Sequence, residues 1–565
     1  MACLAIDVGT FNTCACVTRD GVKEIVRDNG DPLIPSVIRY NNDGSVQCIG
    51  KNAYRNYWSA KNVVRCFKRI IGYRMNSMVM HEYMKNCACR VVEGDDGFPA
   101  FQMPCFPNNE LTPTLCTQHM IEYVKDLATR QREMRFDELV ITVPAFFDNT
   151  QKKEVLKAAR AVRICGEDKI TIVCEPVAAA LDYGVVAGEQ NSRIMVVDIG
   201  GGTTDICVMD INDKNYSVKS TNGDNHLGGD DITNTFRDYL IVKYQEVFNE
   251  RLINAPDNSR LYQVCSEQLK DKAEEAKKLF ATEDSVTIYD LDVVNANITA
   301  NDDSSSDSSS DSSSDSSSDD EDRHCITVDY QDFTDMVKPY VDRIINLTTQ
   351  TLQIGNISEN TIDKVILVGG SSRLRPVQEA LRQRYGNKVM VSNNPDECVA
   401  RGALRASKIE EESTGLVLRQ VIPEYYGFPI YDDYTHREKF QVMIPRNTVY
   451  PNTREFSTNC YLVRKTDGTY IDWADVDLYQ SPDGTLGNAK CLNPFGFSGA
   501  TPSSQAIKVI YTLDRNGFIN VEIIQTYDGR ILLQKEKVVE IKVEEKYVEK
   551  GADDTDSDGI GRAHV

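Results

Sequence analysis

No stretch narrows the choice of fold for this chain as much as residues 196–208, VVDIGGGTTDICV, a glycine-rich turn between two apolar runs. The β-branched residues on both sides predict two short strands joined by a tight turn. Glycines let a backbone approach a ligand closely and leave its N–H groups free to bind anions. The carboxylates of Asp198 and Asp205 can hold a hydrated cation. This turn suits a phosphate-bearing ligand with Mg²⁺, although on its own it fits an ordinary glycine-rich hairpin equally well.

The same arrangement recurs near the N-terminus, in residues 4–18, LAIDVGTFNTCACVT. An apolar run again delivers an aspartate, Asp7, into a turn at Gly9 and Thr10, and a second apolar run follows. Either hairpin alone is weak evidence. Two such hairpins far apart in the sequence predict two related lobes that hold one phosphate chain between them.

Two charged residues follow elements that would lie near such a site. Residues 170–174 predict a strand that ends at Glu175. A carboxylate at a strand end beside a phosphate site suits a general base or a group that orients water. Lys68 lies in the amphipathic run 63–74, where the residues alone favour a solvated surface lysine.

Two segments of the second half could complete a nucleotide site. Residues 364–374, KVILVGGSSRL, predict a strand, a glycine turn and a helix, a junction that can hold a nucleotide at the helix N-terminus. In the predicted helix at about 269–280, Glu274, Lys277 and Lys278 fall on neighbouring turns. Taken alone, that spacing favours an ion-paired helix face.

Composition limits the class of protein. The chain has 565 residues, so we expect two or more domains, and its net charge of −22 disfavours nucleic acid or a membrane surface as a partner. The 17 cysteines show no zinc-binding spacing and favour reduced thiols. We find no signal peptide or membrane span, and expect a cytoplasmic monomer.

Together, the motifs resemble those of the seventy-kilodalton heat-shock chaperones, a family of the actin and sugar-kinase ATPase superfamily. The matching segments cover about 1–408 in the family's order: IDVGT, FKRIIGYR, VITVPAFF, CEPVAAALDYG, VVDIGGGTTDICV, GDNHLGGDD, VILVGGSSRLRPVQ and NNPDECVARGA. The resemblance implies an α/β fold, with a two-lobed actin-like ATPase domain followed by an all-β sandwich domain. It also implies ATP in the cleft between the lobes.

The expected domain limits follow from the same resemblance. The actin-like nucleotide-binding domain would span 1–410, the interdomain linker 411–422, the peptide-binding-like β-sandwich 423–545, and an acidic flexible tail 546–565. So short a tail leaves no room for the helical lid that covers bound peptide in the family. We expect this chain to lack the lid.

Residues 302–322 form an acidic insert of only Ser, Asp and Glu, which cannot bury a core and is expected to be disordered. It is either a tolerated low-complexity expansion, which we favour, or a platform for phosphorylation that a basic partner could bind.

The resemblance also implies roles for individual residues. Lys68 would stabilise charge on the γ-phosphate, Glu175 would place the attacking water, and Asp198 and Thr203 complete the catalytic set. Asp7, Asp198 and Asp205 would surround Mg²⁺ and K⁺, largely through waters. The residues expected to bind ATP or ADP are Gly9, Thr10, Phe11, Gly200, Gly201, Gly202, Thr203, Gly229, Glu274, Lys277, Lys278, Gly369, Gly370, Ser371, Arg373 and Asp396.

Several positions depart from the family pattern. Phe11 replaces a second threonine and cannot donate a hydroxyl hydrogen bond, and Ala281 replaces a serine near the ribose. Thr171 replaces an arginine used for the J-domain partner, which puts that partner in doubt, and Gln420 replaces an aspartate of the linker.

The leading hypothesis is an ATP-dependent molecular chaperone, a slow ATPase that forms ADP and phosphate. It would bind extended hydrophobic polypeptides, with a nucleotide-exchange factor as a further partner. The alternative is a weakly hydrolysing nucleotide-binding scaffold, or a relative of the exchange factors, that acts through contacts with other proteins. A small-molecule kinase of the same superfamily is disfavoured, because no sugar pocket is visible.

Overall fold

The structure, a computed structural model, describes residues 2–19, 22–55, 57, 62–85, 89–94, 97–106, 108, 111–187, 191–256, 259–291, 324–392, 394–407, 417–432, 437–451, 454–461, 474–492, 495–500, 506–526 and 528–537. The acidic insert at 302–322, residues 411–416 of the expected linker and the tail expected at 546–565 lie outside these residues. The expected absence of a helical lid concerns that same C-terminal end.

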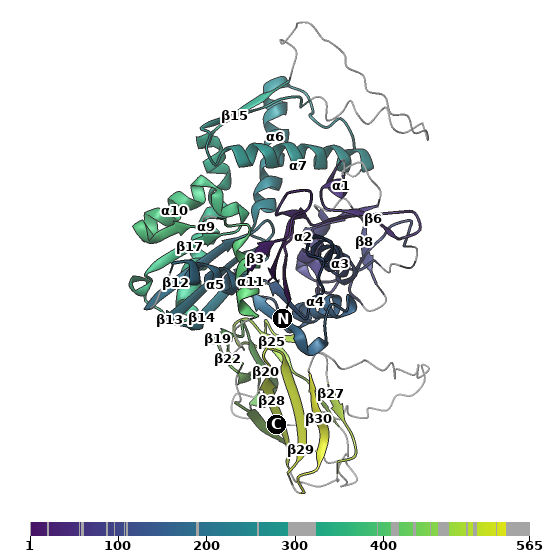
Figure 1. The fold of residues 1–565 in the computed structure, drawn as a ribbon, viewed down its shortest axis with the longest axis vertical. Helices are drawn as coiled ribbons and strands as arrows, with labels where there is room; N and C mark the ends of the chain where they lie inside the picture. Colours follow the sequence, from purple (N-terminus) through teal and green to yellow (C-terminus); the bar gives the residue numbers. More distant parts are fainter. Residues whose placement is uncertain are drawn as a thin grey trace.

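Two α/β lobes are followed by an all-β region, which confirms the predicted fold class (Figure 1). Lobe I is built on a sheet of order β11–β10–β1–β2–β3, with β4 paired to β2. Its strands are β1 (Cys3–Val8), β2 (Asn12–Arg19), β3 (Val22–Ile25), β4 (Ile34–Pro35), β10 (Glu138–Val143) and β11 (Ile170–Cys174). Helices α3 (Pro113–Arg132) and α4 (Asn149–Ala161) belong to the same lobe.

Helix starts in lobe I follow from local chemistry. Thr112 accepts the N–H of Leu115 at 3.2 Å, and Pro113 occupies the first position of α3. Asp148 and Gln151 form a capping box at the start of α4. The upper part of this lobe holds β5 (Val37–Tyr40), α1 (Lys51–Tyr54), β6 (Val46–Ile49), β7 (Val63–Arg65), the short helix η1 (Phe67–Ile70), α2 (Met78–Lys85), β8 (Val91–Glu93) and β9 (Pro99–Phe101).

Lobe II is built on a sheet of order β18–β17–β12–β13–β14–β19–β22. Its strands are β12 (Asn191–Ile199), β13 (Thr204–Asn212), β14 (Asn215–Asp224), β17 (Lys364–Val368), β18 (Val389–Val391), β19 (Val417–Val421) and β22 (Val449–Tyr450). The helices are α6 (Gly229–Phe248), α7 (Arg260–Leu279), α9 (Tyr330–Ile354), α10 (Arg375–Tyr385) and the short η4 (Gly370–Arg373). Strands β15 (Ser285–Ile288) and β16 (Ile326–Asp329) pair antiparallel beyond α7.

Helices α5 (Glu175–Ala187) and α11 (Cys398–Ala406) join the two lobes. They pack so closely that a Cβ placed on Gly402 would lie 1.7 Å from the carbonyl oxygen of Ala178. The buried carboxylate of Asp182 accepts from Arg401 at 3.0 Å and from Arg405 at 3.2 Å. One apolar core runs from these helices into the inner strands of both sheets.

The β region contains two four-stranded sheets, ordered β21–β20–β25–β26 and β23–β28–β29–β30, and a small β24–β27 pair. The strands are β20 (Tyr425–Asp432), β21 (Arg437–Ile444), β23 (Phe456–Tyr461), β24 (Ala474–Val476), β25 (Tyr479–Ser481), β26 (Lys490–Cys491), β27 (Phe495–Phe497), β28 (Ala506–Leu513), β29 (Ile519–Gln525) and β30 (Ile531–Lys537). The turn Asp514–Gly517 joins β28 to β29, where the sequence predicts a hairpin.

The β region is docked on the lobes, and its core is continuous with that of lobe I. Strand β19 extends the lobe II sheet by pairing parallel with β14 and antiparallel with β22. Strand β11 is an edge strand, and side-chain amides of Asn516 and Gln420 accept its N–H groups at Ile172 and Cys174, at 3.0 and 3.2 Å. No helix in the described part of the chain is long and apolar enough to cross a membrane.

Candidate functional site

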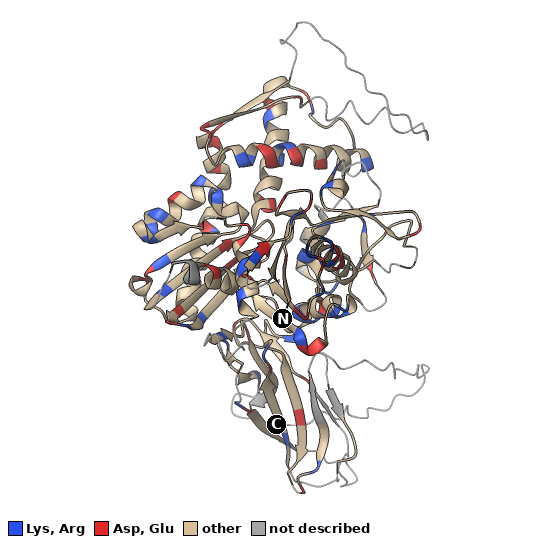
Figure 2. Cartoon of the chain, viewed as in Figure 1, with Lys and Arg blue, Asp and Glu red and all other residues tan. Residues whose placement is uncertain are grey.

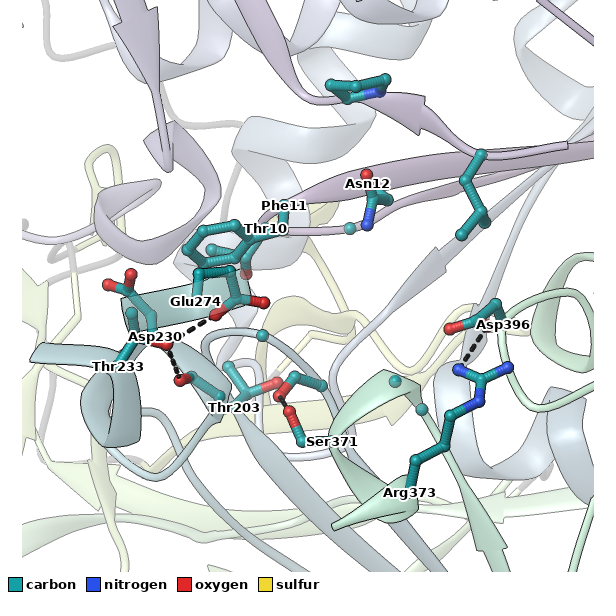
Figure 3. A pocket seen from close by; sticks show the side chains of 18 of the residues that line it. Thr10, Phe11, Asn12, Thr203, Asp230, Thr233, Glu274, Ser371, Arg373 and Asp396 are labelled. Carbon is teal, nitrogen blue, oxygen red and sulfur yellow. Dashed lines mark hydrogen bonds and ion pairs between the residues drawn. The ribbon is translucent and has the colours of Figure 1, made fainter. Parts of the chain in front are cut away.

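A cavity of about 640 Å³ lies between the lobes, where the β1–β2 and β12–β13 turns face each other (Figure 3). Most residues predicted to bind nucleotide, metal or attacking water line this cavity. They are Asp7, Gly9, Thr10, Phe11, Lys68, Glu175, Asp198, Gly200, Gly201, Thr203, Gly229, Glu274, Lys277, Lys278, Gly369, Gly370, Ser371, Arg373 and Asp396. Gly202 and Asp205 are not among its lining residues.

The β1–β2 turn of lobe I is held by two hydrogen bonds from Ser36. Ser36 donates its hydroxyl to the carbonyl of Gly9 at 2.8 Å, and its N–H to the carbonyl of Phe11 at 2.7 Å. A Cβ at Gly9 would lie 2.2 Å from the carbonyl oxygen of Asn12, so the turn requires glycine there. The side chains of Thr10 and Phe11 are thereby presented to the cavity.

The lobe II turn is closed by a bond from the N–H of Gly200 to the carbonyl of Thr203 at 2.9 Å. The carbonyl of Gly200 also accepts from the hydroxyl of Ser371 at 3.0 Å and the N–H of Gly229 at 3.0 Å. These bonds fix the turn against the N-terminus of α6, whose first residue lines the cavity. A helix N-terminus favours anions, so phosphate is the group that fits.

Lys68 and Glu175 both line the cavity and form an ion pair, with Nζ of Lys68 2.5 Å from Oε1 of Glu175. The Lys68 side chain is only 7% exposed. Burial raises the pKa of Glu175 to about 7, against the lowering effect of Lys68. The carboxyls of Glu175, Asp7 and Asp205 hold the pKa of Lys68 above its ordinary value despite burial. The Lys68 ammonium is therefore held in its charged form, in the cavity between the β1–β2 and β12–β13 turns.

Three buried aspartates lie near this pair, and one lysine does not offset the repulsion among their ionised forms. Burial raises the pKa values of Asp7, Asp198 and Asp205, and for Asp198 the nearby Glu175 adds to the effect. A bound cation would relieve this repulsion. Among the described residues, no group of three or more His, Cys, Asp or Glu side chains is placed to hold a metal by itself. The donor set fits Mg²⁺ held with waters and phosphate oxygens.

Comparison with known proteins bears directly on this geometry. The HSP70 family model, described as Hsp70 protein, matches residues 3–558.

This chain belongs to the Hsp70 family.

The match agrees with the resemblance found in the sequence, and Hsp70 proteins form a family of ATP-binding chaperones. Similar curated proteins include Chaperone protein DnaK 3 of Synechococcus, 29% identical over 93% of this chain and 75% of that protein. The mitochondrial iron-sulfur cluster biogenesis chaperone of Saccharomyces cerevisiae is 26% identical over 93% of this chain and 76% of its own length. Chaperone protein DnaK of Ureaplasma urealyticum is 28% identical over 92% of this chain and 76% of its own length.

The cavity of this Hsp70 protein extends to a second end, formed by α7, η4 and the loop before α11. Lys277 contacts Glu274 at 2.5 Å and donates to the carbonyl of Gly229 at 2.8 Å. Lys278 reaches the same glutamate at 3.3 Å from the solvent side. Charges of both signs run along α7 (Figure 2), as the spacing predicts. Across the cavity Arg373 pairs with Asp396 at 2.6 Å (Figure 3), and these paired polar groups suit a nucleoside.

Two predicted residues do not line the cavity but contact the opposite lobe beside it. Asp205 accepts the N–H of Ala145 at 2.6 Å, which ties the lobe II hairpin to the segment after β10 in lobe I. The carbonyl of Gly202 accepts from Arg69 at 2.9 Å, and a Cβ there would lie 2.8 Å from the same guanidinium. Both residues thus connect the lobes.

Sequence reasoning missed a set of buried charges at the cavity, of which Asp230 and Lys270 are lining residues. Lys270 pairs with Asp230 at 2.5 Å, both side chains almost fully buried, and Arg69 pairs with Asp231 at 2.6 Å. Three nearby cations hold the pKa of Asp230 well below its usual range despite burial. A signal existed for Lys270, because it shares one face of α7 with Glu274, four positions later. The two acids after a glycine pair in GDNHLGGDD were a similar signal.

Proposed function

We propose that this chain is an ATP-dependent molecular chaperone that binds Mg-ATP between its lobes and extended hydrophobic polypeptides in its β region. The observation that carries the proposal is the buried Lys68–Glu175 pair, set between two glycine turns on a shared cavity. Membership of a family that binds ATP with Mg²⁺ and unfolded polypeptides supports it.

The residues that line the cavity support one mode of nucleotide binding. Backbone N–H groups of the two turns and the hydroxyls of Thr10 and Thr203 would cradle the phosphates. Asp7 and Asp198 would hold Mg²⁺, and K⁺ beside it, through waters. Bound Mg²⁺ supplies neutralisation of the phosphate charge. Glu274, Lys277 and Arg373 would enclose the nucleoside.

Hydrolysis would depend on the central ion pair. Lys68 would stabilise negative charge that develops on the γ-phosphate. The carboxylate of Glu175 would accept a hydrogen bond from the attacking water and orient it in line. The 2.5 Å contact holds the two side chains in position before the nucleotide arrives, so little reorganisation would be needed once Glu175 is ionised.

A second candidate, favoured by Phe11, is a weakly hydrolysing nucleotide-binding scaffold, or a relative of the exchange factors, that acts through contacts with other proteins. A phenyl ring stands where the family pattern has a threonine hydroxyl, so one donor to phosphate is missing. Thr171 on the edge strand β11 disfavours a J-domain partner in either case, whereas a nucleotide-exchange factor remains a suitable partner.

Single-turnover ATP hydrolysis separates the two candidates. We expect slow hydrolysis that an extended hydrophobic peptide accelerates, and a loss of about a hundredfold or more in Lys68→Ala. Lys157→Ala, which changes an exposed lysine of α4 away from the cavity, is the matched control and should leave the rate unchanged. Tight ATP binding with no turnover in the unaltered chain would reject the chaperone and leave the scaffold.

A further inference from the structure

We propose that Phe11 acts as an apolar latch across the phosphate end of the cleft and slows the release of nucleotide. This positioning role rests on the proposed nucleotide binding but concerns how long nucleotide stays, and not whether it binds. Phe11 belongs to the lobe I turn, and the residue it meets belongs to the lobe II turn.

The ring lies directly over Gly201. A Cβ placed on Gly201 would lie 2.4, 3.0 and 3.2 Å from three ring carbons of Phe11, and these are its three nearest atoms. Any side chain larger than hydrogen would have to displace the ring, so the ring packs on bare backbone. In Figure 3 the Phe11 ring points from the lobe I turn toward the side of the pocket where Glu274 and Thr203 lie. The contact crosses the cleft that nucleotide must leave.

Hydrogen bonds to backbone carbonyls hold the turns on both sides of this contact. Ser36 holds the Phe11 turn through two hydrogen bonds, as described above. On the other side, the carbonyl of Gly201 accepts the N–H of Asp230 at 2.7 Å at the start of α6. Because both turns are fixed within their own lobes, movement of the lobes apart carries the ring away from Gly201.

Other interlobe contacts continue from Phe11 along the cleft. The Arg65 guanidinium lies 6.0 Å from the Phe11 ring centre and 4.3 Å from that of Tyr57. Arg65 also pairs with Glu267 of α7 at 2.6 Å. Tyr57 donates to Glu267 and to Asp271 of the same helix, each at 3.1 Å. Opening the cleft therefore separates an apolar contact and a set of charged contacts together.

Dissociation of a fluorescent ADP, N-methylanthraniloyl-ADP, from the full chain in a stopped-flow instrument tests the latch. Removing the ring in Phe11→Thr should speed release about tenfold, which corresponds to the apolar area that one ring face buries on backbone. Phe11→Leu keeps part of that area and should give an intermediate rate. Phe98→Thr is the control, because its ring also lies under an arginine, Arg74 at 4.5 Å, but does not line the cavity.

Gly201→Ala supplies an independent test. Its methyl group would push the ring away, so release should accelerate in the otherwise unaltered chain. In the Phe11→Thr background the same change should have no further effect, because the ring it meets is gone. Additive effects, or unchanged release in Phe11→Thr with intact ADP binding, would overturn the latch alone. Absence of ADP binding by the unaltered chain would overturn the proposed function, and the latch with it.

Discussion

Gln420 places its side-chain oxygen 3.2 Å from the backbone nitrogen of Cys174, the residue immediately before Glu175. Strand β19, which lies in the segment expected to be the interdomain linker, thus touches the end of the edge strand that precedes a candidate catalytic carboxylate. Undocking of the β region would return this N–H to water and release the strand end. We expect this contact to couple the expected linker to the Lys68–Glu175 pair.

Gln420→Ala should reduce the coupling between peptide and ATP. A buried hydrogen bond contributes about 1 kcal/mol, so peptide stimulation of single-turnover hydrolysis should fall about fivefold. Arg419→Ala is the control, since Arg419 is the neighbour on the same strand and is exposed. Equal loss in both variants would mean that the strand matters and the amide does not.

The pH dependence of kcat/KM for ATP should report Glu175. Burial raises the pKa of this carboxyl to about 7, and only its ionised form pairs with Lys68 and accepts a hydrogen bond from water. kcat/KM reports ionisations of the free protein, so it should rise as pH increases through about 7 and then level off. Glu175→Gln should be slow and flat over this range. A wild-type profile flat between pH 6 and 8 would contradict the assignment.

Docking of the β region should weaken as pH rises. Burial, with help from Asp148, raises the pKa of Glu424 from its ordinary 4.5 to about 7, while Lys490, Arg446 and Lys152 oppose the shift. Because the pKa is raised in the folded state, the carboxyl favours docking below its ordinary value, and that stabilisation is lost as pH rises through about 7.

Hydrogen exchange of the Ile172 and Cys174 amides, measured at pH 6 and pH 8 and corrected for intrinsic rates, checks this. Protection should be lower at pH 8, and Glu424→Gln should remove the difference. Glu438→Gln changes an exposed glutamate of β21 and should leave the difference intact.

Gly402→Ala should destabilise the junction of the lobes. The added methyl group would lie 1.7 Å from the Ala178 carbonyl oxygen, so α5 and α11 must move apart at a cost of about 1–3 kcal/mol. Thermal unfolding measures the loss. Gly487→Ala, where a Cβ meets nothing within 4 Å, serves as the control and should leave the melting temperature within error.

The sequence was sufficient for features whose signal is local. Both glycine turns lie where their residues predict them, because close backbone approach needs glycine regardless of the rest of the fold. The ion-paired face of α7 is also confirmed, since partners three and four residues apart must meet on a helix. That the same face lines the cavity could not be read from the spacing.

Features that depend on distant partners were beyond local reasoning. Residue patterns alone favoured a solvated Lys68, but its partner Glu175 lies 107 positions away and buries it. The environment of Glu424 is made by residues of α4, β26 and the segment after β21, which no local pattern brings together. The family resemblance supplied the role of Lys68 and supplied nothing for Glu424.

Strands β15 and β16 pair Ile288 with Ile326, so the chain leaves this hairpin and returns to it at one point. The entropy cost of closing a connection there grows only slowly with its length. Insertions of very different size can thus be accommodated at this point while the pairing register and the nucleotide cavity stay as they are. For the same reason, this position is a suitable place to fuse a reporter domain without disturbing either lobe.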